Sequence, residues 1–335
     1  MTVHFGILGA ARIADAVLIR PSRLVTGAAV HGIASRDTGK SAQFANQNNI
    51  VAYPDYESLI HSSRIDAIYI PLINSRHCEW SVNALRAGKH VLCEKPIANN
   101  LAETRNMVDA ASVADRILFE GMHYREHPLM SRVKALVSEM KNVYRIDAKF
   151  CLPLVNPGNH RFEYECGGGA LMDLGCYCIN AIRFMAYSAG FTDDPTVTGV
   201  NAKCRSPNVD RSMSATMLWK EGLTGVFQCS LFSRHLYASS LSVTGEDGSF
   251  SVYNPFLPHR YNFIKGRIGK IRFSETIRAG STYTHQLQAF LDCIDKKRDT
   301  NLADSIATMK LIDDIYQLAG LPVRGMSNSV RKQRD

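Results

Sequence analysis

Short, continuously apolar runs alternate with amphipathic stretches over the first 125 residues of the chain. The apolar runs have the length and the Val, Ile, Leu and Phe content of buried strands, and they lie at 3–9, 28–35, 67–73, 90–95 and 116–121. The segments between them carry apolar residues at helical spacing. Strands that are apolar on both faces and alternate with helices predict a parallel sheet covered on both sides, the doubly wound α/β layout.

The pattern changes near residue 143, where strand-like runs begin to follow one another directly. They lie at 143–152, 196–204, 212–220, 224–232, 239–245 and 248–254, with helical stretches at 170–187, 283–296 and 302–319. Consecutive strands joined by turns predict antiparallel pairing. We therefore expect a dinucleotide-binding domain over 1–125 and an α+β domain over 126–335, with a last helix that returns toward the first domain.

Composition excludes several classes of protein. A length of 335 residues exceeds what a single core usually supports, and 45% hydrophobic with 21% charged residues is typical of a soluble globular protein. Apolar runs such as 66–73 are far shorter than the roughly 20 residues of a membrane helix. Because the chain opens on strand-like sequence without a charged-then-apolar leader, we expect a cytoplasmic protein with no membrane partner.

The cysteines and the charge add little chemistry. Nine cysteines are scattered without a CxxC pair, which favours reduced, mostly buried thiols. The formal net charge of +8 is spread along the chain, and the one dense basic cluster is the tail 324–335. We interpret that tail as a frayed terminus rather than a nucleic-acid patch, and a basic balance also suits an anionic cofactor.

The stretch GILGAARIADAV, 6–17, resembles the phosphate-binding turn of a dinucleotide fold with two glycines replaced. The pattern G-x-G-x-x-G would place glycine at 9, 11 and 14, where the chain has Gly9, Ala11 and Ala14. Gly9 permits the tight turn and Ala14 still allows close helix packing, whereas a methyl group at Ala11 displaces the pyrophosphate slightly. A strand before and a helix after favour a cofactor site over a bare turn, with contacts from Gly9, Ala10, Ala11, Arg12 and Ile13.

The end of the second strand indicates which cofactor binds. An acidic residue there would bind the ribose 2′-hydroxyl of NAD(H), whereas arginine accommodates the 2′-phosphate of NADP(H). This chain has Ser35 and Arg36, followed by Lys40. We therefore favour NADP(H), with NAD(H) as the alternative, and we interpret Asp37 as the N-cap of the next helix rather than a ribose ligand.

Two other motif interpretations are weak. The stretch 38–41, TGKS, ends like a P-loop, but the first glycine of that motif would stand where the chain has Ala34. His123 and His127 have i, i+4 spacing that suits a metal, yet no third ligand falls nearby, and we predict no metal site.

Candidate catalytic groups lie in both halves. Lys95 follows the fifth strand, and ligands of doubly wound sheets bind at those strand ends. Asp173 and Tyr177 have i, i+4 spacing in a helix that follows three glycines, so both project from one face. A phenol beside an ammonium is a suitable proton donor and acceptor for alcohol–carbonyl interconversion, although a lone Tyr is more often core packing.

Three stretches together carry a family resemblance: GILGAARIA, PLINSRHCEWSVNALRAGKHVLCEKPIA and GGGALMDLGCYCIN. Over essentially its whole length the chain resembles the glucose–fructose oxidoreductase, inositol dehydrogenase and rhizopine catabolism family (Gfo/Idh/MocA). The resemblance implies a Rossmann domain followed by a large, mostly antiparallel open sheet, and hydride transfer between a nicotinamide and a sugar, polyol or related carbonyl. It also implies a homodimer or homotetramer that covers the outer, apolar face of that sheet.

The resemblance assigns roles to individual residues. Lys95 is its EKP lysine, Asp173 its helix carboxylate, and Tyr177 its acid/base where other members have His. That tyrosine, with Ala11, is similar to the branch of glucose–fructose oxidoreductase, aldose dehydrogenases, dihydrodiol dehydrogenases and keto-sugar reductases. The resemblance also implies cofactor contacts from Pro71, Leu72, Asn74, His77, Glu94, Lys95 and Met122. It implies substrate contacts from Lys95, Tyr124, Arg161, Asp173 and Tyr177. His77 is equally well interpreted as a helix cap.

These observations predict an NADP(H)-preferring oxidoreductase that acts on the CH–OH group of a sugar or related cyclic compound. Within enzymes, a dihydrodiol dehydrogenase or a keto-sugar reductase is the alternative. Outside enzymes, the alternative is a catalytically silent NAD(P)-binding regulator or redox sensor, which would not need Lys95, Asp173 and Tyr177 together.

Overall fold

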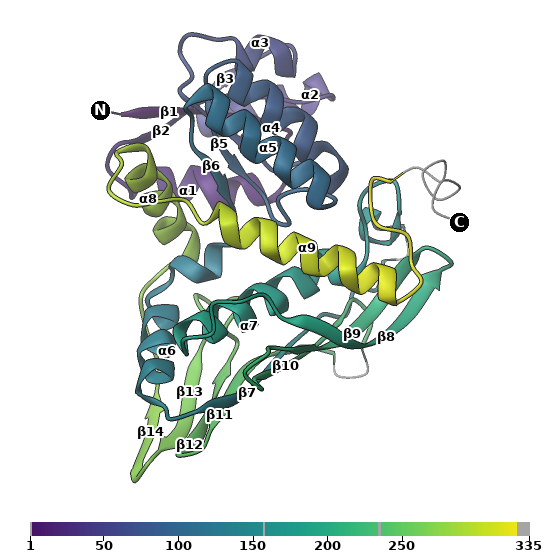
Figure 1. The fold of residues 1–335 in the computed structure, drawn as a ribbon. Coiled ribbons are helices and arrows are strands. Elements are labelled where there is room, and N and C mark those ends of the chain that lie inside the picture. Colours follow the sequence, from purple (N-terminus) through teal and green to yellow (C-terminus); the bar gives the residue numbers. More distant parts are fainter. Residues whose placement is uncertain (1, 157, 234–235, 327–335) are drawn as a thin grey trace. The chain divides into compact units, whose positions relative to one another are not determined.

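The computed structural model describes residues 2–156, 158–233 and 236–326 (Figure 1). The chain divides into two compact units. The first contains the described residues up to Ala98 together with Ala102–Glu126 and Gly280–Ser305. The second contains Asn99–Leu101, His127–Ala279 and the described residues from Ile306 onward.

The first unit is built on a parallel sheet of six strands in the order β3-β2-β1-β4-β5-β6. The strands are β1 Val3–Leu8, β2 Ala28–Ala34, β3 Val51–Ala52, β4 Ala67–Ile70, β5 His90–Cys93 and β6 Leu118–Glu120. β1 pairs with both β2 and β4, so the strand order reverses at β1. The doubly wound α/β prediction is therefore confirmed, and only the short, exposed β3 was not predicted.

Helices lie on both faces of this sheet (Figure 1). The elements are a π-helical turn η1 Asp15–Ile19, α1 Arg20–Ser22, α2 Thr38–Asn48, α3 Tyr56–Ile60, η2 Asn74–Arg76, α4 His77–Arg86, α5 Leu101–Ala114, η3 His123–Glu126 and α8 Thr282–Ile294. Phe290 of α8 packs against Phe5 and Phe119, with ring centroids 5.7 and 5.9 Å away. Although α8 comes late in the sequence, it belongs to the first unit, because its apolar face completes the core of that unit.

The second unit contains an eight-stranded sheet in the order β14-β13-β12-β11-β7-β10-β9-β8. Its strands are β7 Val143–Cys151, β8 Thr196–Ser206, β9 Val209–Leu218, β10 Thr224–Ser230, β11 Ala238–Gly245, β12 Gly248–Tyr253, β13 Phe263–Ile268 and β14 Ile271–Glu275. All pairs are antiparallel except β7 with β10. The predicted mostly antiparallel sheet is confirmed, with β13 and β14 as additional strands.

The two faces of this sheet differ in chemistry. One face buries Ile146, Ala148 and Phe150 of β7, and α7 Cys176–Ser188 packs over it. The remaining helical elements of the unit are α6 Pro128–Glu139, η4 His160–Phe162, η5 Leu171–Gly175 and α9 Leu302–Leu318.

The other face is polar, with half-buried Ser212, Ser214 and Thr216 on β9, with Ser240, Ser242 and Thr244 on β11, and with Arg145, Asp147 and Lys149 on β7. The expectation of an apolar outer face is therefore wrong, because the positions that alternate with the core residues on these strands are hydroxylic or charged. Assembly as a homodimer or homotetramer remains a prediction.

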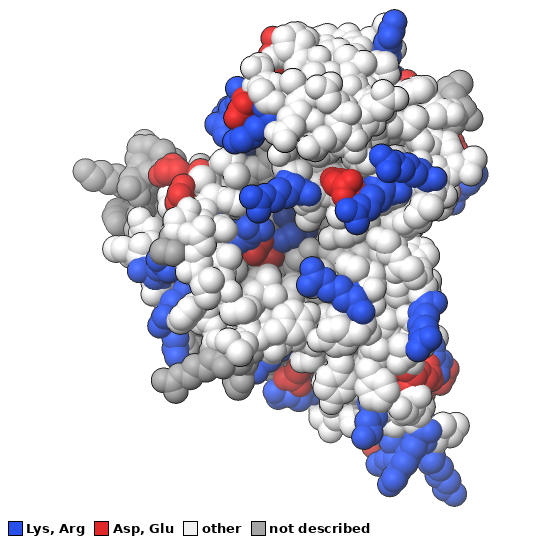
Figure 2. All heavy atoms as spheres, turned by 180° about the vertical axis from the view of Figure 1, so that it is seen from behind, with Lys and Arg blue, Asp and Glu red and all other residues white. Residues whose placement is uncertain are grey.

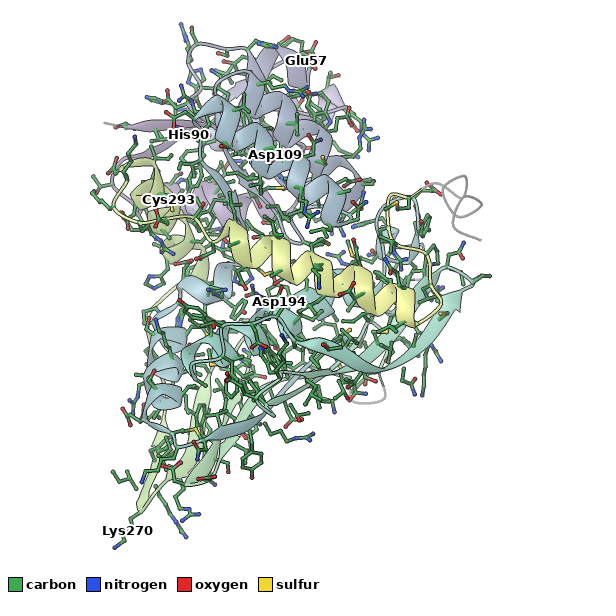
Figure 3. All side chains as sticks on the ribbon, in the orientation of Figure 1. Glu57, His90, Asp109, Asp194, Lys270 and Cys293 are labelled. Atoms are coloured by element: carbon green, nitrogen blue, oxygen red, sulfur yellow. The ribbon has the colours of Figure 1, made fainter. Side chains whose placement is uncertain are left out.

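Other expectations concern the whole chain. All nine cysteines are unpaired and six are buried, as predicted. Figure 2 shows the basic side chains of one face in separate groups, with acidic side chains among several of them. Lys270 lies at the turn between β13 and β14 (Figure 3). Within the described residues, no helix combines the length and apolar character needed to cross a membrane.

Candidate active site

A pocket of about 260 Å³ opens in the first unit at the carboxyl ends of β1, β2 and β4. This is where the strand order reverses, which is the position of the ligand crevice in doubly wound sheets. The pocket is lined by eight of the predicted cofactor residues: Gly9, Ala10, Ala11, Ser35, Arg36, Lys40, Pro71 and Leu72. Asp37, Tyr56, Ile73 and Arg76 complete the lining.

Gly9 forms a turn that no other residue fits. Its φ is +97°, and its amide donates to the carbonyl of Ala34 at 2.7 Å. A Cβ at this position would lie 2.9 Å from Cδ2 of Leu72. The glycine therefore keeps open the cradle that a dinucleotide pyrophosphate would occupy.

The side of the pocket formed by β2 and α2 is basic and polar. Ser35 is half-buried, while Arg36 and Lys40 are exposed. Asp37 caps α2 by accepting from the amide of Lys40 at 3.0 Å, as predicted, and this hydrogen bond lowers the pKa of its carboxyl group. The Lys40–Asp37 ion pair of 3.3 Å is exposed, and such pairs contribute only ~0–1 kcal/mol. A bound phosphate dianion can therefore compete for Lys40.

Two lining residues, Tyr56 and Arg76, were missed by the sequence analysis. The Tyr56 ring stacks edge-on against Trp80, with centroids 4.7 Å apart. Arg76 pairs with Glu79 at 2.8 Å. Tyr56 belongs to no motif, and Arg76 lies in the stretch 71–98 that carries the family resemblance but was assigned no role there. The crossover connections of the fold bring both residues to the glycine turn.

The other predicted cofactor residues do not line this pocket. Arg12 and Ile13 are exposed in the turn after Gly9, Asn74 begins η2, and Met122 is buried. The buried imidazole of His77 lies between the carbonyl oxygens of Pro96, at 2.9 Å, and Leu72, at 3.0 Å. His77 therefore links the segments that follow β4 and β5.

Polar groups also gather at the carboxyl end of β5. Glu94 accepts a hydrogen bond of 2.7 Å from Tyr69, and burial raises the pKa of its carboxyl group. Lys95 follows directly and is half-buried. A Cβ on Gly121 would lie 3.5 Å from Cα of Glu94 and 3.7 Å from Oε1 of Gln286. No group of the described residues donates a hydrogen bond to that buried oxygen, so it can accept from an amide group of a cofactor placed here.

Two further residues of the first unit have packing roles. Tyr124, predicted to face substrate, is completely buried. The ring of His123 packs against Tyr283, with centroids 4.6 Å apart. In the second unit, His127 accepts from the amide of Leu129 at 3.1 Å and caps α6.

The predicted substrate-side residues of the second unit surround the start of α7. Asp173 lies in the π-helical turn η5, and its carboxylate accepts from Nε of Arg161 at 2.9 Å. Tyr177, one turn further along, is 6% exposed. Its ring packs against Phe150 and Phe256, with centroids 5.5 and 5.7 Å away. The structure therefore brings Arg161 and Asp173 together and holds the tyrosine ring in a fixed aromatic cluster.

A buried polar network fixes the glycine turn that precedes these residues. The carboxylate of Asp210 accepts from the amide of Leu171 at 2.7 Å and from the Tyr316 hydroxyl at 2.9 Å. Arg324 completes the network by donating to Asp210 at 2.9 Å and to the carbonyl of Gly168 at 2.6 Å. The turn is thus held by two distant parts of the chain, the strand residue Asp210 and the segment from Tyr316 to Arg324.

Gly169 is required by this network, because its φ is +135° and a Cβ there would collide with Asp210. Arg324 was assigned to a frayed tail, and that assignment is wrong, because its side chain is completely buried. Residues 327–335 of the predicted tail lie outside the described part of the chain.

Comparison with known sequences identifies the family. Residues 3–122 match the profile of the oxidoreductase family with an NAD-binding Rossmann fold, GFO_IDH_MocA. Residues 131–251 match the GFO/IDH/MocA C-terminal domain.

Similar proteins cover nearly the whole chain. D-xylose 1-dehydrogenase (NADP(+)) 2 of Haloferax volcanii is 30% identical over 94% of this chain and 97% of its own length. Trans-1,2-dihydrobenzene-1,2-diol dehydrogenase of Xenopus tropicalis is 27% identical over 96% of this chain and 99% of its own length. The crystal structure of KijD10, a 3-ketoreductase from Actinomadura kijaniata, shares the fold with a TM-score of 0.86. The two sequences are 23% identical, and the match covers 95% of this chain and 98% of KijD10. The chain therefore belongs to the Gfo/Idh/MocA family of nicotinamide-dependent oxidoreductases, as its motifs predicted.

Proposed function

We propose that this protein is an NADP(H)-preferring enzyme that transfers a hydride between the nicotinamide and a CH–OH or carbonyl carbon of a sugar or similar cyclic compound. The observation that carries the proposal is the pocket at the strand-order reversal, with its Gly9 cradle and its basic side. Ser35, Arg36 and Lys40 supply two cations and a hydroxyl for a 2′-phosphate. The acidic residue beside them, Asp37, accepts from the amide of Lys40 and caps α2.

The relatives support the choice of substrate class. The Haloferax volcanii protein is named for D-xylose and NADP(+), and the Xenopus tropicalis protein for a cyclic diol. A dTDP-sugar 3-reductase of Saccharopolyspora spinosa is 32% identical over 76% of this chain and of its own length. The compounds in these names each have a ring carbon that carries a hydroxyl or keto group. This chain is therefore expected to act on such a carbon.

The proposed chemistry uses groups from both units. A bound nicotinamide supplies or accepts the hydride. In the oxidising direction, Tyr177 in its phenolate form accepts the hydroxyl proton and becomes the neutral phenol, while Lys95 positions the same oxygen and stabilises its developing negative charge. Asp173, held by Arg161, orients the substrate through a second hydroxyl. Either Lys95 or Tyr177 can hold the proton.

The test measures nicotinamide absorbance with aldoses, keto-sugars and cyclic diols. Lys95→Ala and Tyr177→Phe should each lower kcat by about 10²–10⁴, with the Kd of NADP(H) nearly unchanged. Lys270→Ala, at a distant hairpin turn, and Tyr187→Phe, on the exposed side of α7, are the matched controls. Full turnover in either active-site variant would remove that residue from the mechanism. Tight cofactor binding without turnover on any compound would favour the catalytically silent regulator.

A further inference from the structure

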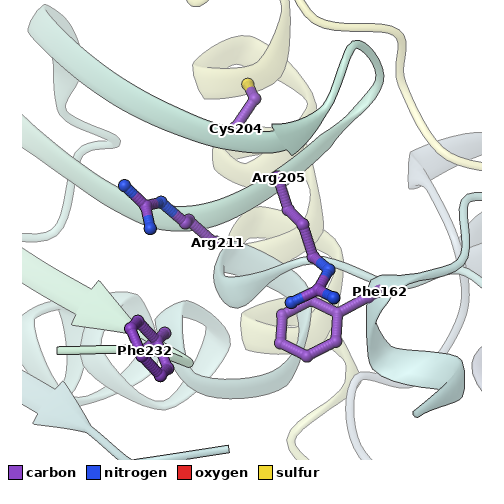
Figure 4. A pocket seen from close by; sticks show the side chains of 5 residues that line it. All are labelled: Phe162, Cys204, Arg205, Arg211 and Phe232. Atoms are coloured by element: carbon purple, nitrogen blue, oxygen red, sulfur yellow. The ribbon is translucent and has the colours of Figure 1, made fainter. Parts of the chain in front are cut away.

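A second pocket, in the second unit, combines aromatic and cationic side chains. It measures about 230 Å³ and is lined by Phe162, Cys204, Arg205, Arg211 and Phe232 (Figure 4). These side chains come from η4, from the end of β8, from the start of β9 and from the segment after β10. Separate parts of the chain thus bring two guanidinium groups and two phenyl rings to one small cavity.

Neither guanidinium group of this pocket is neutralised. Arg205 and Arg211 are both exposed, and among the described residues neither has a carboxylate within ion-pair distance. The carboxylate nearest in sequence, Asp210, is committed to the buried pair with Arg324. The pocket therefore has a net positive charge that an anion can neutralise.

The aromatic residues give the pocket a second kind of surface. The guanidinium carbon of Arg205 lies 4.4 Å from the centroid of the Phe162 ring, which holds this cation over an aromatic face (Figure 4). Phe232 is 57% exposed, so a ligand in the pocket can reach its ring. Arginine forks bind phosphate oxygens in a bidentate manner, and exposed rings pack against sugars and bases.

The pocket adjoins the proposed substrate residues within the same unit. Phe162 directly follows Arg161, whose guanidinium group is bonded to Asp173. Asp173 in turn lies in the π-helical turn η5, which leads directly into α7 and Tyr177. A ligand that fills the pocket therefore lies beside Arg161, the residue that holds the Asp173 carboxylate in place.

We propose that this pocket binds the phosphoryl group of a phosphorylated sugar, with Arg205 and Arg211 on the phosphate and Phe232 against the adjoining ring. The proposal rests on the proposed oxidoreductase function, because the sugar ring would extend toward Asp173. The volume is smaller than the roughly 300–1,000 Å³ of pockets that enclose a whole drug-sized ligand. It fits a phosphoryl group with one ring, whether this belongs to a sugar phosphate or to a nucleotide-linked sugar.

A binding experiment tests the pocket without any turnover. Pyrophosphate is titrated calorimetrically into the wild type and into Arg205→Gln and Arg211→Gln. Each substitution should weaken binding about tenfold or more, because each removes a charged hydrogen-bond donor. The titrations are run with saturating NADP(H), because the Gly9 cradle of the cofactor pocket also suits pyrophosphate. Arg272→Gln, an exposed arginine of β14, should leave the binding unchanged. If Arg205→Gln and Arg211→Gln bind pyrophosphate as tightly as the wild type, or if NADP(H) abolishes the binding, the proposal is overturned.

A kinetic experiment then compares a neutral sugar, its 1-phosphate and a nucleoside diphosphate sugar. Arg205→Gln should lower kcat/KM about tenfold for the phosphorylated compounds and leave the neutral sugar nearly unchanged. Phe232→Ala should affect the nucleotide-linked sugar most if a base packs on that ring. Equal losses for neutral and phosphorylated sugars would overturn the subsite while leaving the oxidoreductase proposal intact. A protein that turns over none of them but keeps the arginine-dependent pyrophosphate binding would fail as an enzyme and still possess the subsite.

Discussion

Arg324 and Asp210 form an ion pair of 2.9 Å in which both side chains are completely excluded from solvent. The pair anchors the glycine turn ahead of Asp173 and Tyr177, so the last described segment of the chain stabilises the start of the proposed substrate site.

Removing one partner of this pair should be strongly destabilising, because the other charge stays buried. We expect Asp210→Asn to lower the free energy of unfolding by about 3–5 kcal/mol. The control is Asp147→Asn, which breaks a partly exposed pair with Arg145 and should cost less than about 1 kcal/mol. Chemical denaturation of the two variants checks the difference, and equal losses would contradict it.

Glu120 should make stability depend on pH. Burial raises the pKa of its carboxyl group to about 7, although the amide of Ile97 and the hydroxyl of Ser305 donate to it at 2.9 and 2.6 Å. Its unfolded pKa is about 4.3, so between that value and about 7 the folded state binds more protons and stability falls as the pH rises. The full loss is about 4 kcal/mol, because each unit of difference between the two pKa values is worth about 1.4 kcal/mol, and the loss is complete above the folded pKa.

Glu120→Gln should remove this dependence and be more stable than the wild type above about pH 7. Urea midpoints between about pH 5 and about pH 8 provide the measurement. Glu275→Gln is the opposite control, because Arg132 lowers the pKa of the Glu275 carboxyl group. Removing that carboxylate should therefore lower the free energy of unfolding at neutral pH. An unchanged slope in Glu120→Gln would show that another group titrates.

Gly9→Ala should impair cofactor binding beyond its effect on stability. The positive φ alone costs roughly 1–2 kcal/mol, and the new methyl group would also press on Leu72. Gly88→Ala is a matched control, because Gly88 has a φ of +78° but no atom within 4 Å of its virtual Cβ. Fluorescence titration with NADPH should show a loss of about tenfold or more only for Gly9→Ala. Similar affinities in both variants would mean that the cradle does not bind the dinucleotide.

Arg36→Gln should change cofactor preference rather than abolish binding. Loss of one charged hydrogen bond costs about 1.5–3 kcal/mol, so the Kd of NADPH should rise about tenfold or more while that of NADH changes little. Arg64→Gln, an exposed arginine of the same unit, serves as the reference. A parallel rise for both cofactors would place Arg36 away from the 2′-phosphate.

The fold was predictable because its signals are local. Apolar strands that alternate with helices specify the parallel sheet, and the strand-like runs after residue 143 specify the antiparallel one. The N-cap role of Asp37 follows from the same short-range chemistry, since a carboxylate there satisfies an amide of the first helical turn.

The missed features depend on contacts between distant parts of the sequence. Nothing near Arg324 indicates that it binds a carboxylate 114 positions away, so a basic tail was the natural interpretation. Tyr56 reaches the glycine turn only through a crossover connection. The outer sheet face was misjudged because an apolar face was carried over from the family resemblance. In β9 and β11 of this chain, Ser and Thr alternate with the buried residues and so occupy that face.

The insertion of α8 into the first unit limits the modularity of the protein. A gene fragment that ends at Glu126 would encode every strand of the nucleotide-binding sheet and yet leave Phe5 and Phe119 without Phe290. Such a fragment would expose the apolar surface that α8 normally covers and would be prone to aggregate. Recombination in evolution or in the laboratory must therefore carry the late helix along with the early strands.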